Sequence, residues 1–399
     1  MKILQINCVY QSGSTGKIVD CIGQELRSLG HEVFTCYGNG KSHLDEHSVK
    51  VCSAFEHTFN AALGRIIGIP FGGIYLSNLR IYHIIRKFRP DVVHIHCING
   101  YTMNVYSLLK YCARQHLKTV LTLHAEIFHT AGCAHAYDCE KWKEGCHDCE
   151  VYKKNRISWF LERSRASWRK MYDAINSFDY NNLTITGVSP WLTERAKQSA
   201  IMKRYNVVYV PNGVDTSIFH RREGAHLIDR GRYQKVVLFV TPWFSHNEND
   251  LKSGRFIPIL ADALPDYMFV VVASRMSNEL RPMSNNVQIW GRAKSQEELA
   301  KLYSEADVTL ILSRRETFSM VTAESLCCGT PVVGFKAGGP ESIAIPEASI
   351  FVEYGDINSL VGALKNEFEV VNRQGISFRA KEIYSSESMA IGYLKLYES

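Results

Sequence analysis

Two carboxylates eight positions apart, Glu316 and Glu324, offer the most specific chemistry in this sequence. Glu316 closes an apolar stretch, 307–313, that is typical of a strand, and Glu324 lies at the start of an expected helix, 323–328. In open α/β sheets, ligands bind beyond the carboxyl ends of the strands. Carboxylates accept hydrogen bonds from hydroxyl groups, so two of them at this edge suit the hydroxyls of a sugar and of a ribose.

The elements that would position this pair are short apolar strands alternating with helices. Such alternation indicates parallel sheets covered by helices on both faces. The pattern restarts after a turn at Pro211-Asn212-Gly213, which predicts two doubly wound domains with a junction between 206 and 219. The expected strands are 3–6, 31–37, 91–96, 119–124, 184–188, 235–241, 267–273, 287–290, 308–312 and 331–335, and helices are expected at 17–29 and 296–304.

Composition and charge narrow the class of protein. The 399 residues are 46% hydrophobic and 22% charged, which is ordinary for a globular chain of two domains. The net charge of +6 comes without a basic and aromatic module, so no nucleic-acid partner is expected. No apolar run reaches about 18 residues, and the first residues are typical of a strand and not of an export signal. Twelve cysteines without an export signal indicate reduced thiols and a cytoplasmic protein.

Several short motifs follow the order seen in a known family. With two amino-terminal segments, Gly30-His31-Glu32-Val33 and 90–96, they resemble the retaining GT-B glycosyltransferases of the large family 4. The resemblance covers nearly the whole chain, and the stretch after His124 is similar to bacterial enzymes of surface-polysaccharide assembly. The carboxy-terminal motifs are Pro211-Asn212-Gly213-Val214-Asp215, Glu316-x7-Glu324, Gly329-Thr330-Pro331-Val332-Val333 and Gly338-Gly339-Pro340-Glu341.

The resemblance implies an α/β protein of the GT-B fold, with two doubly wound Rossmann-like domains facing a cleft. Residues 1–205 would bind the acceptor, with a C-terminal helix, 385–399, returning to this domain, and residues 206–384 would bind the nucleotide sugar. The implied activity is retaining transfer of a sugar from a nucleotide-sugar donor to a saccharide acceptor, lipid-linked, in capsule, O-antigen or exopolysaccharide synthesis. Two alternatives stay open: a nucleotide-sugar epimerase of the same architecture, and a non-catalytic GT-B subunit that binds a partner enzyme.

The resemblance also implies roles for individual residues of the second domain. Glu316 would act at the donor sugar near the reacting carbon, with Thr317, Phe318 and Ser319 beside it in the donor site, and Glu324 would bind the ribose. Without a residue suited to act as a nucleophile for double displacement, we expect the acceptor to attack on the same face that the leaving phosphate departs from. That phosphate would then accept the acceptor's proton.

The leaving diphosphate needs positive charge, and here the sequence departs from the family. Lys252 matches the family's lysine position, but the segment 242–246 has no arginine at the expected place. Arg255 either replaces it or is a solvated helix residue. An Asp-x-Asp metal motif is not evident, so we expect catalysis without a metal or other cofactor, with the diphosphate held by Lys252 and backbone N–H groups.

Two glycine segments each have two interpretations. Gly13 and Gly16 are not part of a P-loop, because Gln11 stands where that motif needs glycine and Ile18 where it needs Ser or Thr. They form either a loop close to the donor phosphates, as the family implies, or a plain turn. Gly338-Gly339 likewise either brings backbone N–H groups to the diphosphate or only forms a turn.

Three histidines lie at or near the ends of expected strands. His124 ends the strand 119–124, and the family has a histidine there near the sugar, so we assign His124 to the catalytic site; a structural histidine is the alternative. His94 and His96 alternate with apolar residues, and one of them is expected to face the core. We therefore assign neither to the site.

A cysteine-rich segment follows His124. Cys146-His147-Asp148-Cys149 has the C-x2-C spacing of zinc sites, whereas Cys133 and Cys139 are spaced C-x5-C. His135 and His147 add further candidate ligands. A structural zinc ion bound by the four cysteines, a disulfide pair, and four unligated thiols remain alternatives, and in each case we expect the segment to shape the acceptor side of the site.

A basic segment comes next. Residues 153–170 contain seven lysines and arginines against one acid, Glu162, with Trp159, Phe160 and Trp168 among them. A basic helix with aromatic residues can lie on anionic lipid, which would place the protein at the inner face of the cell membrane. The alternative is a helix with its aromatic residues in the core and its charges in water.

Overall fold

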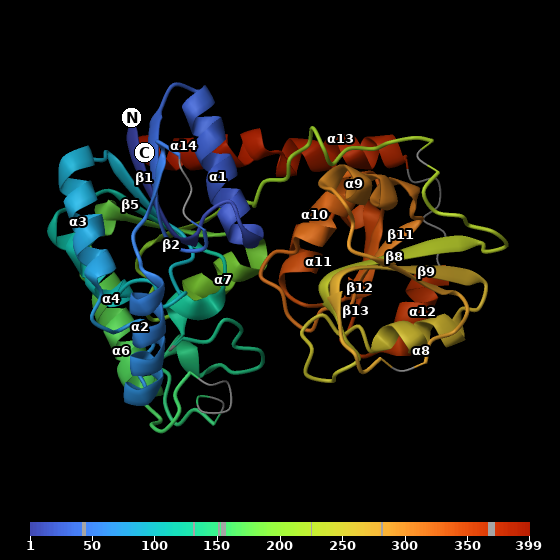
Figure 1. Ribbon diagram of the computed structural model, residues 1–399, viewed down its shortest axis with the longest axis horizontal. Coiled ribbons are helices and arrows are strands. Elements are labelled where there is room, and N and C mark those ends of the chain that lie inside the picture. The colour runs from blue at the N-terminus through green and yellow to red at the C-terminus, as the bar shows by residue number, and fades with distance from the viewer. Residues whose placement is uncertain are drawn as a thin grey trace. The chain divides into compact units, whose positions relative to one another are not determined.

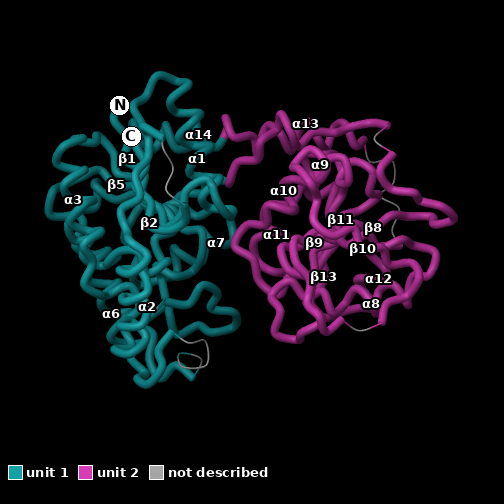
Figure 2. Tube along the Cα trace, in the orientation of Figure 1, with its two compact units in different colours: residues 1–211, 389–399 teal, residues 212–388 magenta. Residues whose placement is uncertain are grey.

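The computed structural model describes residues 1–41, 45–130, 132–150, 152, 157–224, 226–280, 282–365 and 372–399 (Figure 1). The chain divides into two compact units, Met1–Pro211 with Met389–Ser399, and Asn212–Ser388 (Figure 2). Each unit contains one parallel sheet with helices around it. The predicted class, α/β with two doubly wound domains, is therefore confirmed.

The sheet of the first unit has seven parallel strands in the order β3-β2-β1-β4-β5-β6-β7. The order changes direction between β1 and β4, and such a switch point is where doubly wound sheets bind ligands. Strands β4 and β5 are buried along their whole length, as expected for a sheet covered on both faces. The strands are β1 (Lys2–Val9), β2 (Glu32–Asn39), β3 (Ser48–Lys50), β4 (Val92–Ile95), β5 (Thr119–Leu123), β6 (Leu183–Gly187) and β7 (Asn206–Tyr209).

Amphipathic helices surround this sheet. The first, α1, buries Ile18, Ile22 and Leu26, which recur at helical spacing. None of the described helices in either unit has both the length and the apolar composition needed to cross a membrane. The helices are α1 (Gly13–Ser28), α2 (Ala54–Ile67), α3 (Leu76–Phe88), α4 (Val105–Arg114), α6 (Ser164–Ile175) and α7 (Pro190–Gln198), with 3-10 turns η1 (Glu126–His129), η2 (Lys141–Lys143) and η3 (Tyr180–Asn182).

The last helix, α14 (Ser386–Glu398), brings the end of the chain back to the first unit. Its side chains Tyr393 and Tyr397 are fully buried there. The Tyr397 hydroxyl lies 2.6 Å from Nδ1 of His94, and the Tyr393 hydroxyl accepts a hydrogen bond from Thr122 at 3.2 Å. Residues 389–399 therefore complete the core of the first unit.

The sheet of the second unit has six parallel strands in the order β10-β9-β8-β11-β12-β13. Its switch point lies between β8 and β11. The core is made by strand residues such as Phe239, Phe269 and Phe335, with Leu260 and Leu360 from the covering helices. The strands are β8 (Lys235–Phe244), β9 (Tyr267–Met276), β10 (Val287–Gly291), β11 (Val308–Ile311), β12 (Val332–Phe335) and β13 (Ser349–Val352). The helices are α8 (Phe256–Ala263), α9 (Gln296–Glu305), α10 (Met320–Cys327), α11 (Gly339–Ile343), α12 (Ile357–Lys365) and α13 (Arg373–Tyr384), with the 3-10 turn η4 (Pro346–Ala348).

Several boundaries differ from the expected ones. Residues 206–209 form β7, which pairs with β6, so the first unit extends to Pro211 and not only to 205. Helix α1 begins at Gly13 rather than 17, and α10 begins at Met320 rather than 323. The earlier start of α10 follows from Ser319, whose hydroxyl accepts a hydrogen bond from the N–H of Thr322 and so caps the helix.

Candidate active site

A lysine and a glutamate form an ion pair at the carboxyl edge of the second sheet. Lys252 Nζ lies 2.7 Å from Oε1 of Glu316, and the Ser313 hydroxyl donates to the same oxygen. Lys252 follows β8 and Glu316 follows β11, the two strands at the switch point. The side chains of Lys252 and Glu316 are 22% and 13% exposed, so the pair is largely shielded from water and still accessible to a ligand.

A glycine loop holds the segment that carries Glu316. The N–H of Gly339 donates to the Glu316 carbonyl at 2.8 Å, and the N–H of Gly338 donates to the Glu341 carboxylate at 2.7 Å. A Cβ atom on Gly339 would lie only 2.5 Å from the backbone nitrogen of Phe318, so a larger residue does not fit. Because both N–H groups are used inside the protein, the structure favours a packing turn over a diphosphate contact for Gly338-Gly339.

The residues after Glu316 have different surroundings. Thr317 is partly exposed, whereas Phe318 is buried with its ring 6.1 Å from that of Tyr384. Ser319 has a φ of 88°, a left-handed backbone that is strained for a residue with a side chain. Phe318 and Ser319 therefore fix the shape of the loop, and Thr317 has the more accessible side chain.

The sequence led us to expect Glu324 at the start of its helix. In the structure it lies in the second half of α10. Its Oε2 accepts a hydrogen bond from the Tyr303 hydroxyl of α9 at 3.0 Å. Burial, together with the charge of Glu324, raises the pKa of Tyr303 well above its usual value, so Tyr303 remains a donor. No sequence motif indicated Tyr303, because its contact with Glu324 joins two helices. It orients the Glu324 carboxylate.

Arg255 lies at the start of α8 and is engaged locally. Its Nη1 donates to the Glu248 carbonyl at 3.4 Å, and its guanidinium lies 4.9 Å from the ring centroid of Phe256. The cation joined to Glu316 is Lys252. The structure thus brings Lys252 and Glu316 together and gives Arg255 different partners.

In the first unit, His124 lies just beyond β5 and is partly exposed. Its Nε2 is 3.4 Å from Nδ1 of His96, which is fully buried. Burial lowers the pKa of His124 to about 4, so its ring is neutral at neutral pH. The ring centroids of His96 and His94 are 3.7 Å apart. The two histidines that the sequence analysis left out therefore support the one it assigned to the site.

The first turn of α1 contains the other two predicted residues of this unit. Gly13 has a φ of 64°, a conformation that favours glycine. A Cβ atom on Gly16 would lie 3.2 Å from the Val9 side chain, so the helix start packs closely on the end of β1. The cap residue of this described helix, Ser12, makes no side-chain cap hydrogen bond. Helix N-termini attract anions such as phosphate, which suits the first turn of α1.

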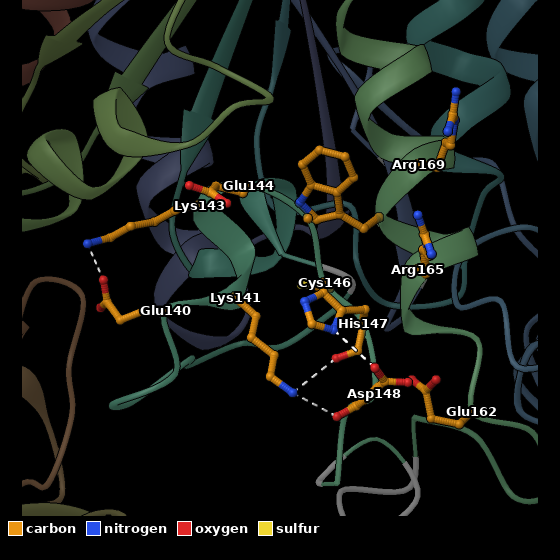
Figure 3. A pocket seen from close by; sticks show the side chains of 12 residues that line it. Glu140, Lys141, Lys143, Glu144, Cys146, His147, Asp148, Glu162, Arg165 and Arg169 are labelled. Atoms are coloured by element: carbon orange, nitrogen blue, oxygen red, sulfur yellow. Dashed lines mark hydrogen bonds and ion pairs between the residues drawn. The ribbon is translucent and has the colours of Figure 1, made fainter.

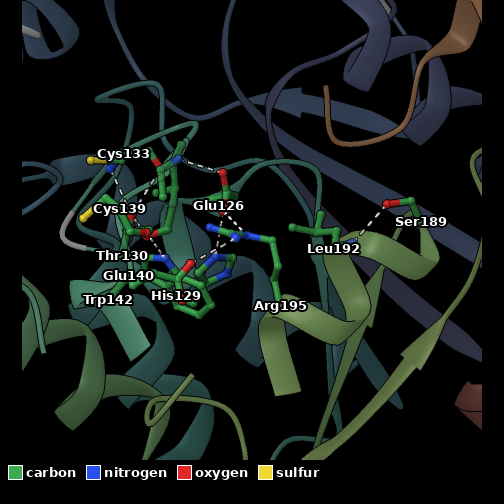
Figure 4. A network of polar contacts seen from close by, with 12 residues as sticks. Glu126, His129, Thr130, Cys133, Cys139, Glu140, Trp142, Ser189, Leu192 and Arg195 are labelled. Carbon is green, nitrogen blue, oxygen red and sulfur yellow. Dashed lines mark hydrogen bonds and ion pairs between the residues drawn. The ribbon is translucent and has the colours of Figure 1, made fainter. Parts of the chain in front are cut away.

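A buried ion pair anchors the start of the cysteine-rich segment to α7. Arg195 Nε donates to Oε1 of Glu126 at 2.6 Å, and Figure 4 shows Arg195 reaching from α7 toward this carboxylate. The other oxygen accepts the N–H of Ala136 at 2.7 Å, and His129 Nε2 lies 3.4 Å from Oε1. The sequence analysis missed this network, because the two charged partners are far apart in the chain and neither belongs to a motif.

None of the four cysteines of this segment, all of which the structure describes, forms a disulfide. Cys133, Cys146 and Cys149 belong to one apolar cluster that includes the buried Trp142, whereas Cys139 is exposed. Burial and the neighbouring thiols raise the pKa of Cys133 to about 12. Within the described residues, no group of three or more histidines, cysteines, aspartates or glutamates is arranged to hold a metal ion.

A cavity of about 850 Å³ lies between the cysteine-rich segment and α6 (Figure 3). Some of its polar side chains pair with one another: Lys143 pairs with Glu140, and His147 Nδ1 lies 3.2 Å from Oδ2 of Asp148. Lys141 Nζ donates to the backbone oxygen of Asp148 at 2.9 Å. His124 is not among its lining residues, so this cavity is separate from the candidate active site. The lining residues are Glu140, Lys141, Lys143, Glu144, Gly145, Cys146, His147, Asp148, Glu162, Arg165, Trp168 and Arg169.

Comparison with known families decides which class of enzyme this geometry belongs to. Residues 16–218 match Glycosyltransferase Family 4, and residues 234–368 match Glycosyl transferases group 1. The first match alone spans half of the chain. This chain belongs to glycosyltransferase family 4. The family predicted from the sequence motifs is therefore confirmed, and the protein is a glycosyltransferase.

Two relatives illustrate the range of the family. A putative colanic acid biosynthesis glycosyl transferase, WcaC of Escherichia coli K12, is 21% identical over 436 aligned residues that cover all of both chains. A GDP-mannose-dependent phosphatidylinositol dimannoside mannosyltransferase of Mycobacterium tuberculosis is 23% identical over 84% of this chain and 79% of its own. Both similarities extend over most of the two units.

Solved structures confirm the GT-B fold. Sucrose-phosphate synthase from Thermosynechococcus elongatus superposes with a TM-score of 0.69 at 16% identity, covering 100% of this chain and 98% of its own. HepE of Anabaena, solved in complex with UDP-glucose, gives a TM-score of 0.63 at 13% identity, covering 100% and 99% of the two chains. At these identities the likeness concerns the fold alone.

Proposed function

We propose that this glycosyltransferase transfers a sugar from a nucleotide-sugar donor to a saccharide acceptor with retention of the anomeric configuration. The Lys252–Glu316 ion pair at the switch point of the second sheet carries the proposal. It places a cation 2.7 Å from a carboxylate that can accept hydrogen bonds from sugar hydroxyl groups. A nucleotide sugar needs both groups at its reacting end: positive charge next to the diphosphate, and a hydrogen-bond acceptor next to the sugar hydroxyls. The complex of HepE with UDP-glucose, a protein of the same fold, adds support.

Donor binding exchanges the partners of this pair. Lys252 moves its contact from Glu316 to the diphosphate, and Glu316, still held by Ser313, accepts hydrogen bonds from the sugar. Glu324, oriented by Tyr303, binds the ribose hydroxyls. On the first unit, we propose that the first turn of α1 binds phosphate through its N–H donors and that the neutral imidazole of His124 contacts a sugar.

The reaction replaces one bond to the anomeric carbon by another. The bond from this carbon to the diphosphate oxygen breaks, and the acceptor hydroxyl oxygen forms a new bond on the same face of the sugar. The acceptor's proton passes to the departing phosphate oxygen. Lys252 stabilises the charge that develops on the diphosphate, which is a preorganised electrostatic contribution.

A panel of nucleotide sugars tests this function. A donor that raises the thermal stability of the protein is incubated with saccharide acceptors, and the product linkage is determined by nuclear magnetic resonance. We expect the anomeric configuration of the donor in the product. An inverted linkage would refute retention, and nucleotide release or donor isomerisation that needs no acceptor would favour the epimerase alternative.

Replacing Glu324 with alanine should weaken binding of the nucleoside diphosphate. A hydrogen bond to a charged group contributes roughly 1.5–3 kcal/mol, so the dissociation constant should rise about 10- to 100-fold. Calorimetry with the nucleoside diphosphate measures the change, and Glu305→Ala on α9 is a control outside the candidate site. An unchanged affinity in Glu324→Ala would exclude the ribose assignment.

We further propose that the acceptor is lipid-linked and belongs to surface-polysaccharide assembly. Support comes from the full-length similarity to the colanic acid enzyme of E. coli and from an exposed apolar surface on the first unit. On α2, Phe55 is 81% exposed and its ring lies 6.2 Å from that of Phe59. The N–H of Trp159 donates to the carbonyl of Arg65 at 2.9 Å, so the exposed Trp159 and Phe160 adjoin the end of α2.

The structure also corrects the expected basic helix at 153–170. Helix α6 begins only at Ser164, and residues 153–156 lie outside the described residues. Trp168 packs against the cysteine-rich cluster, while Trp159 and Phe160 are exposed. The surface that we propose for anionic lipid therefore combines these two aromatic residues and α2 with the arginines of the neighbouring segment.

Vesicle binding tests this surface. The double variant Phe55→Ser with Phe160→Ser should bind vesicles of anionic phospholipid at least tenfold more weakly, since burying one Phe side chain contributes roughly 1.5–3 kcal/mol. Phe378→Ser, on α13 of the second unit, removes a phenylalanine as exposed as Phe160, at 63%, and should bind like the unchanged protein. Equal binding by all three proteins would exclude this surface.

For the cysteine-rich segment we propose a structural zinc ion held by Cys133, Cys139, Cys146 and Cys149. Three of these thiols already share one apolar cluster, and thiolates are preferred zinc ligands. The segment would have to close around the ion. Elemental analysis of protein prepared without chelator should find about one zinc per chain, lost in Cys146→Ser and kept in Cys112→Ser, a buried cysteine of α4. If the protein contains no zinc, a disulfide pair and unligated thiols remain as the two alternatives.

A further inference from the structure

Two cysteines meet at the carboxyl edge of the first sheet. Cys8 lies near the end of β1 and Cys97 just beyond the end of β4, and these strands are parallel neighbours. The N–H of Cys8 donates to the Cys97 carbonyl at 2.7 Å. Continuing the register that pairs Ile6 with Ile95 places Cys8 opposite Cys97. The Cys97 thiol donates to Oδ1 of Asn99 at 2.5 Å.

The backbone already has the spacing of a disulfide. A disulfide needs Cα atoms about 4.4–6.8 Å apart, and neighbouring strands lie about 4.7–4.9 Å apart. Because a backbone hydrogen bond joins Cys8 and Cys97 across two such strands, a bond between their sulfurs is compatible with the pairing of β1 and β4. Both residues are partly exposed and accessible to a small oxidant, whereas Cys36 and Cys112 are buried.

The contact makes the two thiols chemically unequal. Contact with Cys97 lowers the pKa of Cys8, although burial opposes this. Contact with Cys8 and burial raise the pKa of Cys97, whose thiol donates to Oδ1 of Asn99. The thiolate is the nucleophilic form of cysteine. Cys8 is therefore the attacking sulfur and Cys97 the resolving one.

We propose that Cys8 and Cys97 are a peroxide-sensitive pair that forms a reversible disulfide and thereby lowers transferase activity. The Cys8 thiolate attacks one oxygen of hydrogen peroxide and breaks the O–O bond; it becomes a sulfenic acid, and the other oxygen leaves as water after taking up a proton. The Cys97 sulfur then displaces the sulfenic oxygen, which leaves with the Cys97 proton as water. The pair gives up two electrons, which reduce one peroxide to two waters. A dithiol reductant reverses the reaction.

The place of this pair explains why its oxidation changes turnover. Cys97 directly follows His96, whose ring contacts His124. The loop after Cys97 already packs on Cys8, since a Cβ atom on Gly100 would lie 3.0 Å from Cβ of Cys8. A covalent bond of about 2.05 Å between the sulfurs pulls this loop toward β1 and shifts His96 with it. The effect on turnover rests on the proposed function, whereas disulfide formation does not.

Peptide mapping tests the disulfide on the full-length protein. The protein is treated with hydrogen peroxide, free thiols are alkylated, and the digest is examined by mass spectrometry. We expect a linked peptide pair containing residues 8 and 97 that disappears after dithiothreitol treatment and is absent from Cys97→Ser. Cys21→Ser removes another partly exposed cysteine, on α1, and should keep the link. Oxidised protein without the 8–97 link would overturn the proposal.

Turnover is measured on the same samples. All variants are assayed with the nucleotide sugar and the saccharide acceptor that the unchanged protein uses. We expect at least a fivefold loss after peroxide in the unchanged protein and in Cys21→Ser, restored by dithiothreitol, and no such reversible loss in Cys97→Ser. A link that forms without any loss of turnover would overturn the switch, as would an equal reversible loss in Cys97→Ser. Absence of turnover in the reduced, unchanged protein would count against the proposed function and leave the mapped disulfide standing.

Discussion

Replacing Lys252 with alanine should lower turnover by roughly 10²- to 10³-fold while leaving the fold intact. Lys252 is the cation that contacts Glu316 at the switch point of the second sheet, at 2.7 Å. Losing one preorganised group that stabilises charge developing in the transition state typically costs about that much in turnover. Release of the nucleoside diphosphate at saturating donor measures the effect, and circular dichroism checks the fold.

Two further variants make this result specific. Lys336→Ala removes a lysine of the same unit that also pairs with a glutamate, Glu353, but at an exposed position, and it should turn over almost normally. Glu316→Gln should depress kcat more than it raises KM, as expected for a group that acts mainly in the transition state. Normal turnover in Lys252→Ala would remove Lys252 from the mechanism.

Replacing Arg195 with methionine should destabilise the first unit by roughly 3–5 kcal/mol. The change keeps an apolar side chain of similar length but leaves the fully buried carboxylate of Glu126 without its cation, and breaking a buried ion pair from one side typically costs that amount. The loss includes the stacking of Arg195 on Trp142, at 4.5 Å. Denaturant unfolding followed by the fluorescence of tryptophan residues measures it.

A surface pair on the same helix provides the control. Lys197 pairs with Glu194 on α7, and both side chains are at least half exposed, so Lys197→Met should change the free energy of unfolding by no more than about 1 kcal/mol. Similar losses for Arg195→Met and Lys197→Met would show that the Glu126 network contributes no more than a surface contact.

The same network predicts a dependence on acid. Burial would raise the pKa of Glu126, but the hydrogen bond from His129, the positive charges of His129 and Arg195, and the N–H of Ala136 outweigh burial and lower it to about 2. The usual value is 4.5, so this stabilisation is complete above pH 4.5 and is lost as the pH falls toward 2. In Arg195→Met the pKa of Glu126 should rise, so this acid-induced loss of stability should shrink. An identical pH profile would exclude Arg195 as a cause of the low pKa.

The sequence predicted most strands because buried parallel strands are continuous apolar runs that any window of residues reveals. It placed Glu316 beyond such a strand, where the structure has it. The short strands β3 and β13 were missed because three or four residues at the edge of a sheet carry little pattern of their own. The partners of the site residues were missed for another reason. Ser313 was visible as a strand end, but the contact of Tyr303 with Glu324 depends on how two helices pack.

Long-range polar contacts limited the prediction in the first unit as well. Alternation with apolar residues suggested a core position for His94 or His96, and both are indeed buried. Their alignment with His124 comes from the order of β4 and β5 in the sheet, which local sequence does not encode. The partnership of Glu126 and Arg195 likewise depends on α7 packing beside η1.

The return of α14 to the first unit affects how the chain folds while it is being made. Domains usually fold in the order of their synthesis. Here the first 211 residues cannot close their core until Tyr393 and Tyr397 have been added, and the ribosome must first make the whole second unit. The second unit is therefore free to fold first. During that time His94 and Thr122 lack their hydrogen-bond partners Tyr397 and Tyr393. Chains that stall within residues 212–388 should expose an unfilled seam and become substrates for chaperones and proteases.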